Sequence, residues 1–273
     1  MKMKASRKEL ARMIVFWFVL VSLVVSAFFS LINMIQAPVE RIAGEPFQKI
    51  RGDYTLMLFQ CLVACIIIFL PSLIEKRFKI AIPNYMHIVF VLFLYCSVYL
   101  GEVQDFYYTV PHWDSILHAF SGVMLGALGF SLVDLLNANK RVRLALSPFF
   151  EALFAFCFAV TLGTLWEIYE FAFDGVLGMN MQKFLLADGT PLIGRQALTD
   201  TMKDLIIDMA ASLAVCIAGY IGLKARKKKY ESLLRQGILP MENIEVPQMD
   251  GRQVNPDLSD PSDEPVIGVT REP

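Results

Sequence analysis

Residues 13–35 read MIVFWFVLVSLVVSAFFSLINMI, a stretch without a charged side chain that lies between Arg12 and Glu40. A helix rises about 1.5 Å per residue, so about 20 apolar residues cross the hydrocarbon core of a bilayer. The stretch is longer than the apolar part of a cleaved signal peptide, and no small-residue cleavage pattern follows it. We therefore predict an uncleaved membrane-spanning helix at this position.

Five further stretches have the length and apolar character of a membrane span. They cover residues 54–74, 81–100, about 115–133, about 148–173 and about 205–223. The whole chain is 56% hydrophobic and 19% charged, whereas soluble domains average about 45–50% and about 25%. This excess excludes an ordinary soluble enzyme and a nucleic-acid-binding protein. We predict an all-α bundle of six transmembrane helices over residues 13–223.

The distribution of basic residues predicts the orientation of this bundle. Lys and Arg gather before the first span, between the second and third, between the fourth and fifth, and after the sixth, at Lys2, Lys4, Arg7, Lys8, Arg12, Lys76, Arg77, Lys79, Lys140, Arg141, Arg143, Lys224, Arg226, Lys227, Lys228 and Lys229. Basic loops stay on the cytoplasmic side of a membrane. We therefore expect a cytoplasmic N-terminus (1–12), a cytoplasmic basic anchor with a disordered tail (224–273), and membrane lipid as the main partner.

All five cysteines lie inside the apolar stretches. Their number is odd and their spacing forms no framework, so we expect no structural disulfide bond.

Ionisable side chains inside the last three spans form regular groups. Such residues cost about 2.5–3.5 kcal/mol each on insertion scales, so they mark functional sites by default. The spacings are i,i+4 in the fourth span, i,i+3,i+7 in the fifth and i,i+4,i+8 in the sixth, at Asp114, His118, Glu167, Glu170, Asp174, Asp200, Asp204 and Asp208. Each spacing places its group on one helix face.

The predicted topology brings the three groups to the same side of the membrane, because the fourth span starts outside, the fifth ends outside and the sixth starts outside. We expect an outward-facing pocket whose floor lies near His118, Glu167 and Asp208, with Glu170 and Asp204 in support. Carboxylates with one imidazole suit a divalent metal ion, which is the expected cofactor. The predicted ligands are His118, Glu167, Glu170, Asp204 and Asp208, and the predicted rim consists of Asp114, Asp174, Asp200 and Arg195.

These residues also admit other interpretations. Asp114 and Asp200 could cap the N-termini of their helices. Asp174 could be a solvated residue at a helix end, and His118 could bond a carbonyl group within the bundle. Carboxylates that carry protons would need no metal ion.

Three motifs carry a resemblance to a known family. WDSILHAFSG (113–122), LWEIYEF (165–171) with Asp174, and DTMKDLIIDMAAS (200–212) resemble the YjdF-like family of bacterial inner-membrane proteins. More distantly they are similar to VanZ-like proteins, which share an Asp-xxx-His helix and later acidic helices but tend to carry Asn where this chain has Asp208. The resemblance covers roughly residues 80–225. It implies a multi-pass protein of the bacterial cytoplasmic membrane and carries no reaction with it.

Three functional hypotheses follow from the sequence. The first is a metal-dependent membrane enzyme that acts on a lipid or cell-envelope precursor, with Glu167, His118 and Asp208 as ligands or acid–base groups. The second is a cation- or proton-coupled transporter, although the acids lie near one membrane face, whereas transporter sites usually lie at the midplane. The third is a non-catalytic membrane assembly factor.

Overall fold

The computed structural model describes residues 7–41, 48–78, 82–138 and 146–236. Secondary structure in these segments is helical, apart from an isolated bridge between Leu185 and Pro191. The helices are α1 (Arg7–Gln36), α2 (Arg51–Ile67), α3 (Leu70–Phe78), α4 (Asn84–Leu94), the π-helix η1 (Tyr95–Val103), α5 (Phe106–Thr109), α6 (Trp113–Ala138), α7 (Pro148–Leu177) and α8 (Arg195–Arg235). Residues Lys2, Lys4, Lys79, Lys140, Arg141, Arg143 and the tail beyond 236 lie outside the described segments.

Six helical segments of the described chain are long and apolar enough to cross a membrane. They are α1, α2 with α3, α4 with η1, α6, α7 and α8, which confirms the all-α, six-span prediction. Large apolar side chains such as Phe28, Ile35 and Val176 are exposed, as expected for a surface that contacts lipid. All five cysteines are free.

Local sequence explains where several helices begin and end. Pro71 lacks an amide hydrogen and its ring crowds the preceding turn, so the second span is divided into α2 and α3. Ser147 caps α7 by accepting a hydrogen bond from the Phe150 amide, with Pro148 at the first helical position. Gly178 ends α7 in the left-handed conformation, at φ 63°.

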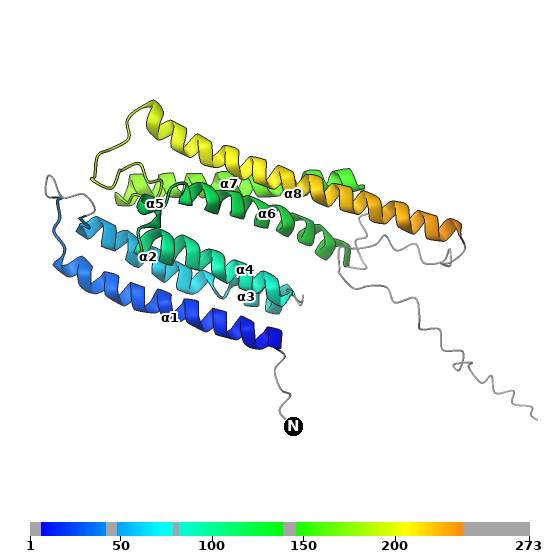
Figure 1. Ribbon diagram of the computed structural model, residues 1–273, viewed down its shortest axis with the longest axis horizontal. Helices are drawn as coiled ribbons and strands as arrows, with labels where there is room; N and C mark the ends of the chain where they lie inside the picture. Colours follow the sequence, from blue (N-terminus) through cyan, green and yellow to red (C-terminus); the bar gives the residue numbers. More distant parts are fainter. Residues whose placement is uncertain (1–6, 42–47, 79–81, 139–145, 237–273) are drawn as a thin grey trace, which may run out of the picture.

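The helices pack in two groups. One core contains buried residues of α1, α2, α4 and η1, including Leu23, Cys61 and Val98. The second core joins α6, α7 and α8 through residues such as Phe130 and Cys216. Figure 1 shows α6, α7 and α8 side by side, with the start of α1 and the end of α8 at the same end of the bundle.

A third core joins the two groups at the opposite end. Leu56 of α2 packs with Met179 and Met181, which follow α7. Phe59 of α2 also lies 5.1 Å, between ring centroids, from Phe173 of α7. The connection between α7 and α8 is therefore part of the packed structure.

Candidate metal centre

His118 lies at the centre of the acidic groups that the sequence predicts. Its Nδ1 atom is 3.0 Å from Oδ2 of Asp208 on α8. Its Nε2 atom is 3.7 Å from Oε1 of Glu167 on α7 and 3.8 Å from Oδ1 of Asp114 on its own helix. Both ring nitrogens therefore face carboxylates, and the predicted residues from three helices do come together.

Glu167 provides the most informative atom of this group. The side chain is only 5% exposed, and its Oε1 atom has no hydrogen-bond partner among the described residues. An unpaired buried oxygen costs about 1–3 kcal/mol and more when it is charged, so this atom would gain stability from a partner beyond those that the described residues provide.

Asp204 completes the cluster from one turn earlier on α8. One potential ligand atom from each of Asp114, His118 and Asp204 lies within 4.8 Å of the others. Asp204 and Asp208 are each 5% exposed. We call Asp114, His118, Glu167, Asp204 and Asp208 the acidic cluster. It gathers four carboxylates around one imidazole.

Asp208 is held on both of its oxygens. Ser121 donates a hydrogen bond of 2.7 Å to Oδ1, while Oδ2 faces His118. The Ser121 hydroxyl also lies 2.8 Å from the carbonyl oxygen of His118. This fixes the Asp208 carboxylate against the first turns of α6.

Glycines allow the three helices to approach closely around the acidic cluster. A Cβ atom at Gly122 of α6 would lie 2.6 Å from the backbone oxygen of Asp208, a distance that real contacts do not reach. Small residues of this kind let helix backbones meet within membranes. Glycines such as Gly122 and Gly163 therefore let α6 and α7 pack directly against Asp208 of α8.

The segment after α7 covers the acidic cluster. Asp174 accepts hydrogen bonds from the amides of Met181 (2.6 Å) and Gln182 (3.0 Å). The Gln182 side chain donates a hydrogen bond to Thr201 of α8 and faces Glu167. Asp174 is thus an anchor for the covering segment and does not join the cluster itself.

The other predicted residues lie around the cluster. Glu170, one turn beyond Glu167, interacts electrostatically with Glu167 and Asp114. Asp200 interacts in the same way with Asp114 and His118. Arg195 is exposed at the start of α8, where it lines an open depression with Thr199 and Lys203.

Neither helix-cap interpretation agrees with the observed helix boundaries. The helix α6 begins at Trp113, which places Asp114 inside its first turn. The N-cap of α8 is Gly194, so Asp200 lies well inside the helix. The sequence pattern placed the start of α8 too late because the polar first turns of this helix do not resemble a membrane span.

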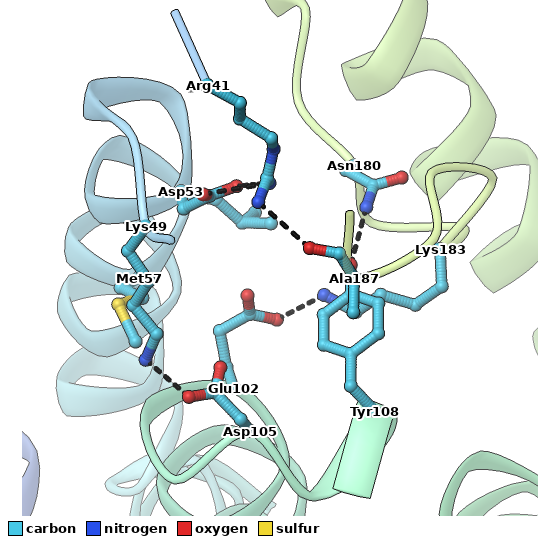
Figure 2. Close-up of a pocket in the computed structure, with 11 residues that line it drawn as sticks. Arg41, Lys49, Asp53, Met57, Glu102, Asp105, Tyr108, Asn180, Lys183 and Ala187 are labelled. Carbon is cyan, nitrogen blue, oxygen red and sulfur yellow. Dashed lines mark hydrogen bonds and ion pairs between the residues drawn. The ribbon is translucent and has the colours of Figure 1, made fainter. Parts of the chain in front are cut away.

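A second group of charges ties the loops together at the same end of the bundle. It contains three ion pairs, Arg41–Asp53 (2.9 Å), Lys49–Asp105 (2.8 Å) and Lys183–Glu102 (2.6 Å), and we call these six residues the charged clasp. Figure 2 shows them around a cavity of about 30 Å³, which has room for about one water molecule. Each cation already faces a carboxylate, so the clasp has no spare positive charge.

The clasp also holds the covering segment in place. Arg41 donates a hydrogen bond to the carbonyl oxygen of Ala187, and the Asn180 amide donates one to the Tyr108 hydroxyl (Figure 2). Lys183 lies over the rings of Tyr107 and Tyr108, at 5.0 and 5.6 Å from their centroids. Residues 180–187 are therefore fastened to α5, η1 and the segment before α2.

The environment of Lys183 favours its charged form. Burial alone would lower the pKa of its ammonium group, but Glu102, together with Tyr108 and Glu170, outweighs this effect, and the pKa lies above its ordinary value. Lys183 also has φ 54°, in the left-handed region that is unfavourable for a residue with a side chain. The ion pair and the two rings hold it there.

Sequence reasoning did not identify the Lys183–Glu102 pair. Glu102 lies at the end of an apolar span, in a connection that has no Lys or Arg of its own, residues 102–113. A buried carboxylate needs a cationic partner. The absence of Lys and Arg from this connection therefore indicates that the partner of Glu102 comes from another part of the chain. Lys183 lies 81 positions further along the chain, too far for local spacing to suggest the pairing.

Comparisons with known proteins agree with a membrane protein. A relative from Thermotoga maritima, described as "Uncharacterized protein", is 28% identical over 142 residues, which is 52% of this chain. The matched region spans 65% of the relative's length. No solved structure matches the chain. A family model described as "Predicted membrane protein (DUF2238)" matches residues 47–225, a range that contains the whole acidic cluster. The chain therefore belongs to the DUF2238 family of predicted membrane proteins.

Proposed function

We propose that the acidic cluster binds a divalent metal ion and that this protein is a metal-dependent membrane enzyme. The observation that carries the proposal is the buried, unpaired Oε1 atom of Glu167, which lies 3.7 Å from Nε2 of His118. An ion between these atoms would give both of them a partner. Asp114 and Asp204 would supply further oxygen ligands from either side.

Charge balance supports the same proposal. Four carboxylates surround one imidazole within the membrane-spanning helices, where unlike charges must compensate one another. Lys183 is already paired with Glu102. A divalent cation would offset two of the four negative charges, and a mixed carboxylate and imidazole set suits Zn²⁺ or Mn²⁺. When bound, such an ion would act as a Lewis acid.

The position of the acidic cluster suggests the class of substrate. His118 lies five residues after the start of α6 and Glu167 ten residues before the end of α7, which is about 8 Å and about 15 Å from those helix ends. The helix α7 has 30 residues and is about as long as a whole bilayer is thick, so such depths correspond to one half of the bilayer, near its headgroup side. We therefore propose a lipid or a cell-envelope precursor as the substrate, approached from the extracytoplasmic leaflet.

The orientation and location of the protein are part of the proposal. Described basic residues such as Arg12, Lys76 and Lys224 lie at the end of the bundle opposite to the acidic cluster, as expected if both termini are cytoplasmic. The relative is bacterial. We accordingly propose a bacterial cytoplasmic membrane and, from the three motifs, a YjdF-like protein with a more distant likeness to VanZ-like proteins.

A structural ion in a non-catalytic assembly factor is the second candidate. It is favoured by the segment after α7, whose Gln182 side chain bonds Thr201 of α8 and faces Glu167 of the acidic cluster. An ion-coupled transporter has less support, because the cluster lies toward one end of the helices and not at their middle.

Metal analysis of the purified full chain tests the central point. After dialysis against Zn²⁺ or Mn²⁺, we expect one ion per chain in the wild type and a strong loss in Glu167→Gln and His118→Gln. Glu151→Gln is the matched control, because Glu151 is a buried glutamate near the other end of α7. Absence of a bound ion in the wild type would overturn the proposal.

A lipid assay separates the three candidates. The wild type in nanodiscs made from bacterial lipid extract should produce a metal-dependent change in the lipid mass spectrum, and Glu167→Gln should not. A bound ion without any lipid change supports the assembly factor. Cation or proton flux into liposomes that disappears in Glu167→Gln would favour the transporter instead.

A further inference from the structure

We infer that Asp208 is a positioning residue for His118 and not a metal ligand, and that Ser121 anchors it. This inference rests on the proposed metal centre and assigns different roles to the two acids of α8. Asp204 belongs to the ligands, whereas Asp208 acts through the imidazole.

The two nitrogens of the His118 ring determine these roles. Nδ1 faces Asp208, and Nε2 faces Glu167 and Asp114. With a metal ion on Nε2, the only proton left on the ring would be on Nδ1, where it would be donated to the Asp208 carboxylate. The imidazole therefore presents a ligand atom to Glu167 and Asp114.

Ring geometry separates Asp208 from an ion at that position. The two nitrogens lie on opposite sides of the imidazole, and an ion at Nε2 would be about 2.1 Å beyond it. The Asp208 oxygen is 3.0 Å from the other nitrogen, in nearly the reverse direction. Asp208 is then several ångströms too far away to bind the same ion directly.

Both Asp208 oxygens are already engaged, which fits a positioning role. Oδ1 accepts the hydrogen bond from Ser121, and Oδ2 lies where a Cβ atom at position 163 would approach within 2.9 Å. Hydrogen bonds from metal-bound histidines to carboxylates fix the ring and strengthen it as a ligand, and their loss typically lowers metal affinity about 10- to 100-fold.

Co²⁺ titration of the full-length protein in detergent tests this inference, because the visible absorption of bound Co²⁺ reports its ligand set. We expect Asp208→Asn to bind one ion about 10- to 100-fold more weakly than the wild type, with an unchanged spectrum. Ser121→Ala should weaken binding less and also keep the spectrum. Asp204→Asn should change the spectrum or abolish binding.

The possible results are distinguishable. If Asp208→Asn changes the spectrum or abolishes binding as Asp204→Asn does, Asp208 is a ligand and the inference fails while the metal centre stands. If Ser121→Ala binds Co²⁺ like the wild type, the anchoring role fails, and this variant keeps the test valid if Asp208→Asn does not fold. If the wild type binds no Co²⁺, Zn²⁺ or Mn²⁺, the proposed function itself fails.

Discussion

The Asp208 carboxylate occupies the space that a side chain at position 163 would require. A Cβ atom placed on Gly163 would lie 2.9 Å from Asp208 Oδ2 and 3.4 Å from its carboxyl carbon. Gly163 belongs to α7 and Asp208 to α8, so the missing side chain on one helix makes room for the functional group of another. The geometry of the acidic cluster therefore depends on a residue that has no chemistry of its own.

Replacing this glycine should disturb the protein although the helix itself would accept alanine. Overpacking of a tight contact costs about 1–3 kcal/mol, so we expect Gly163→Ala to lower the thermal unfolding temperature. Gly175→Ala is the matched control in the same helix, because nothing lies within 4 Å of its added Cβ. It should be neutral or slightly stabilising. Equal effects of the two substitutions would contradict the close packing described here.

The buried Lys183–Glu102 pair should respond strongly to loss of one partner. We expect Lys183→Met or Glu102→Gln alone to lower the free energy of unfolding by about 3–5 kcal/mol, because the remaining charge is left buried and unpaired. The double variant should lose less than the sum of the single variants. Chemical denaturation of the wild type, the two single variants and the double variant gives the interaction free energy between Lys183 and Glu102. Lys203→Met, at an exposed position, is the control and should stay within about 0.5 kcal/mol of the wild type.

The same pair predicts a stability change at alkaline pH. The pKa of Lys183 is raised in the folded protein, so the contribution of its proton is complete below the unfolded pKa of about 10.4 and is lost as the pH rises through the folded value. Tyr107 and Tyr108, whose pKa values are raised by burial, reduce stability in the same direction. The difference in unfolding temperature between the wild type and Lys183→Met should therefore stay constant up to about pH 10 and narrow as the pH rises further. A constant difference would show that Lys183 does not titrate as expected.

Asp174 should control the opening of the segment that covers the acidic cluster. Its carboxylate accepts the amides of Met181 and Gln182, and Asn at this position could accept only through one oxygen. Loss of about 1.4–2.8 kcal/mol of charged hydrogen bonding corresponds to about 10- to 100-fold faster opening. Hydrogen exchange at the Met181 and Gln182 amides of Asp174→Asn measures this opening. Asp188→Asn is the control, because Asp188 accepts its hydrogen bond from Thr190 within an exposed turn, and comparable exchange in both variants would rule out the anchor.

The proposed orientation can be tested with single cysteines in a background that lacks the five native ones. Asp188→Cys, between α7 and α8, should react with a membrane-impermeant maleimide in intact cells. Ser232→Cys, near the end of α8, should react only after the inner membrane is permeabilised. Both positions are exposed. The reverse pattern would place the acidic cluster on the cytoplasmic side and overturn the extracytoplasmic substrate.

The sequence predicts the spans because each one depends on a long uninterrupted run of apolar residues. The uncharged stretch at 13–35 becomes the central part of α1, and the other five stretches also become long helices. Details that depend on polar or non-local effects escape this reasoning. The start of α8 is one such case, and the π-helical turns at Tyr95–Val103, which contain the buried Glu102 partner of Lys183, are another.

The acidic cluster is predictable in its members but not in its internal geometry. Spacing of four residues places Asp204 and Asp208 on one face of α8, and antiparallel connections bring that face near His118. Spacing does not specify which imidazole nitrogen faces which carboxylate, because that depends on side-chain rotation and on Ser121. The division of roles between the two acids therefore becomes visible only in three dimensions.

The helix α8 is 41 residues long and unbroken from Arg195 to Arg235, which corresponds to about 60 Å, or about twice the thickness of the bilayer's hydrocarbon core. It carries Asp204 and Asp208 near one end and the basic residues from Lys224 onward at the other. Because the helix is unbroken, a displacement of one end as a rigid body would also move the other end. A partner that tilts its far end would change the spacing of the carboxylates around His118 without touching them.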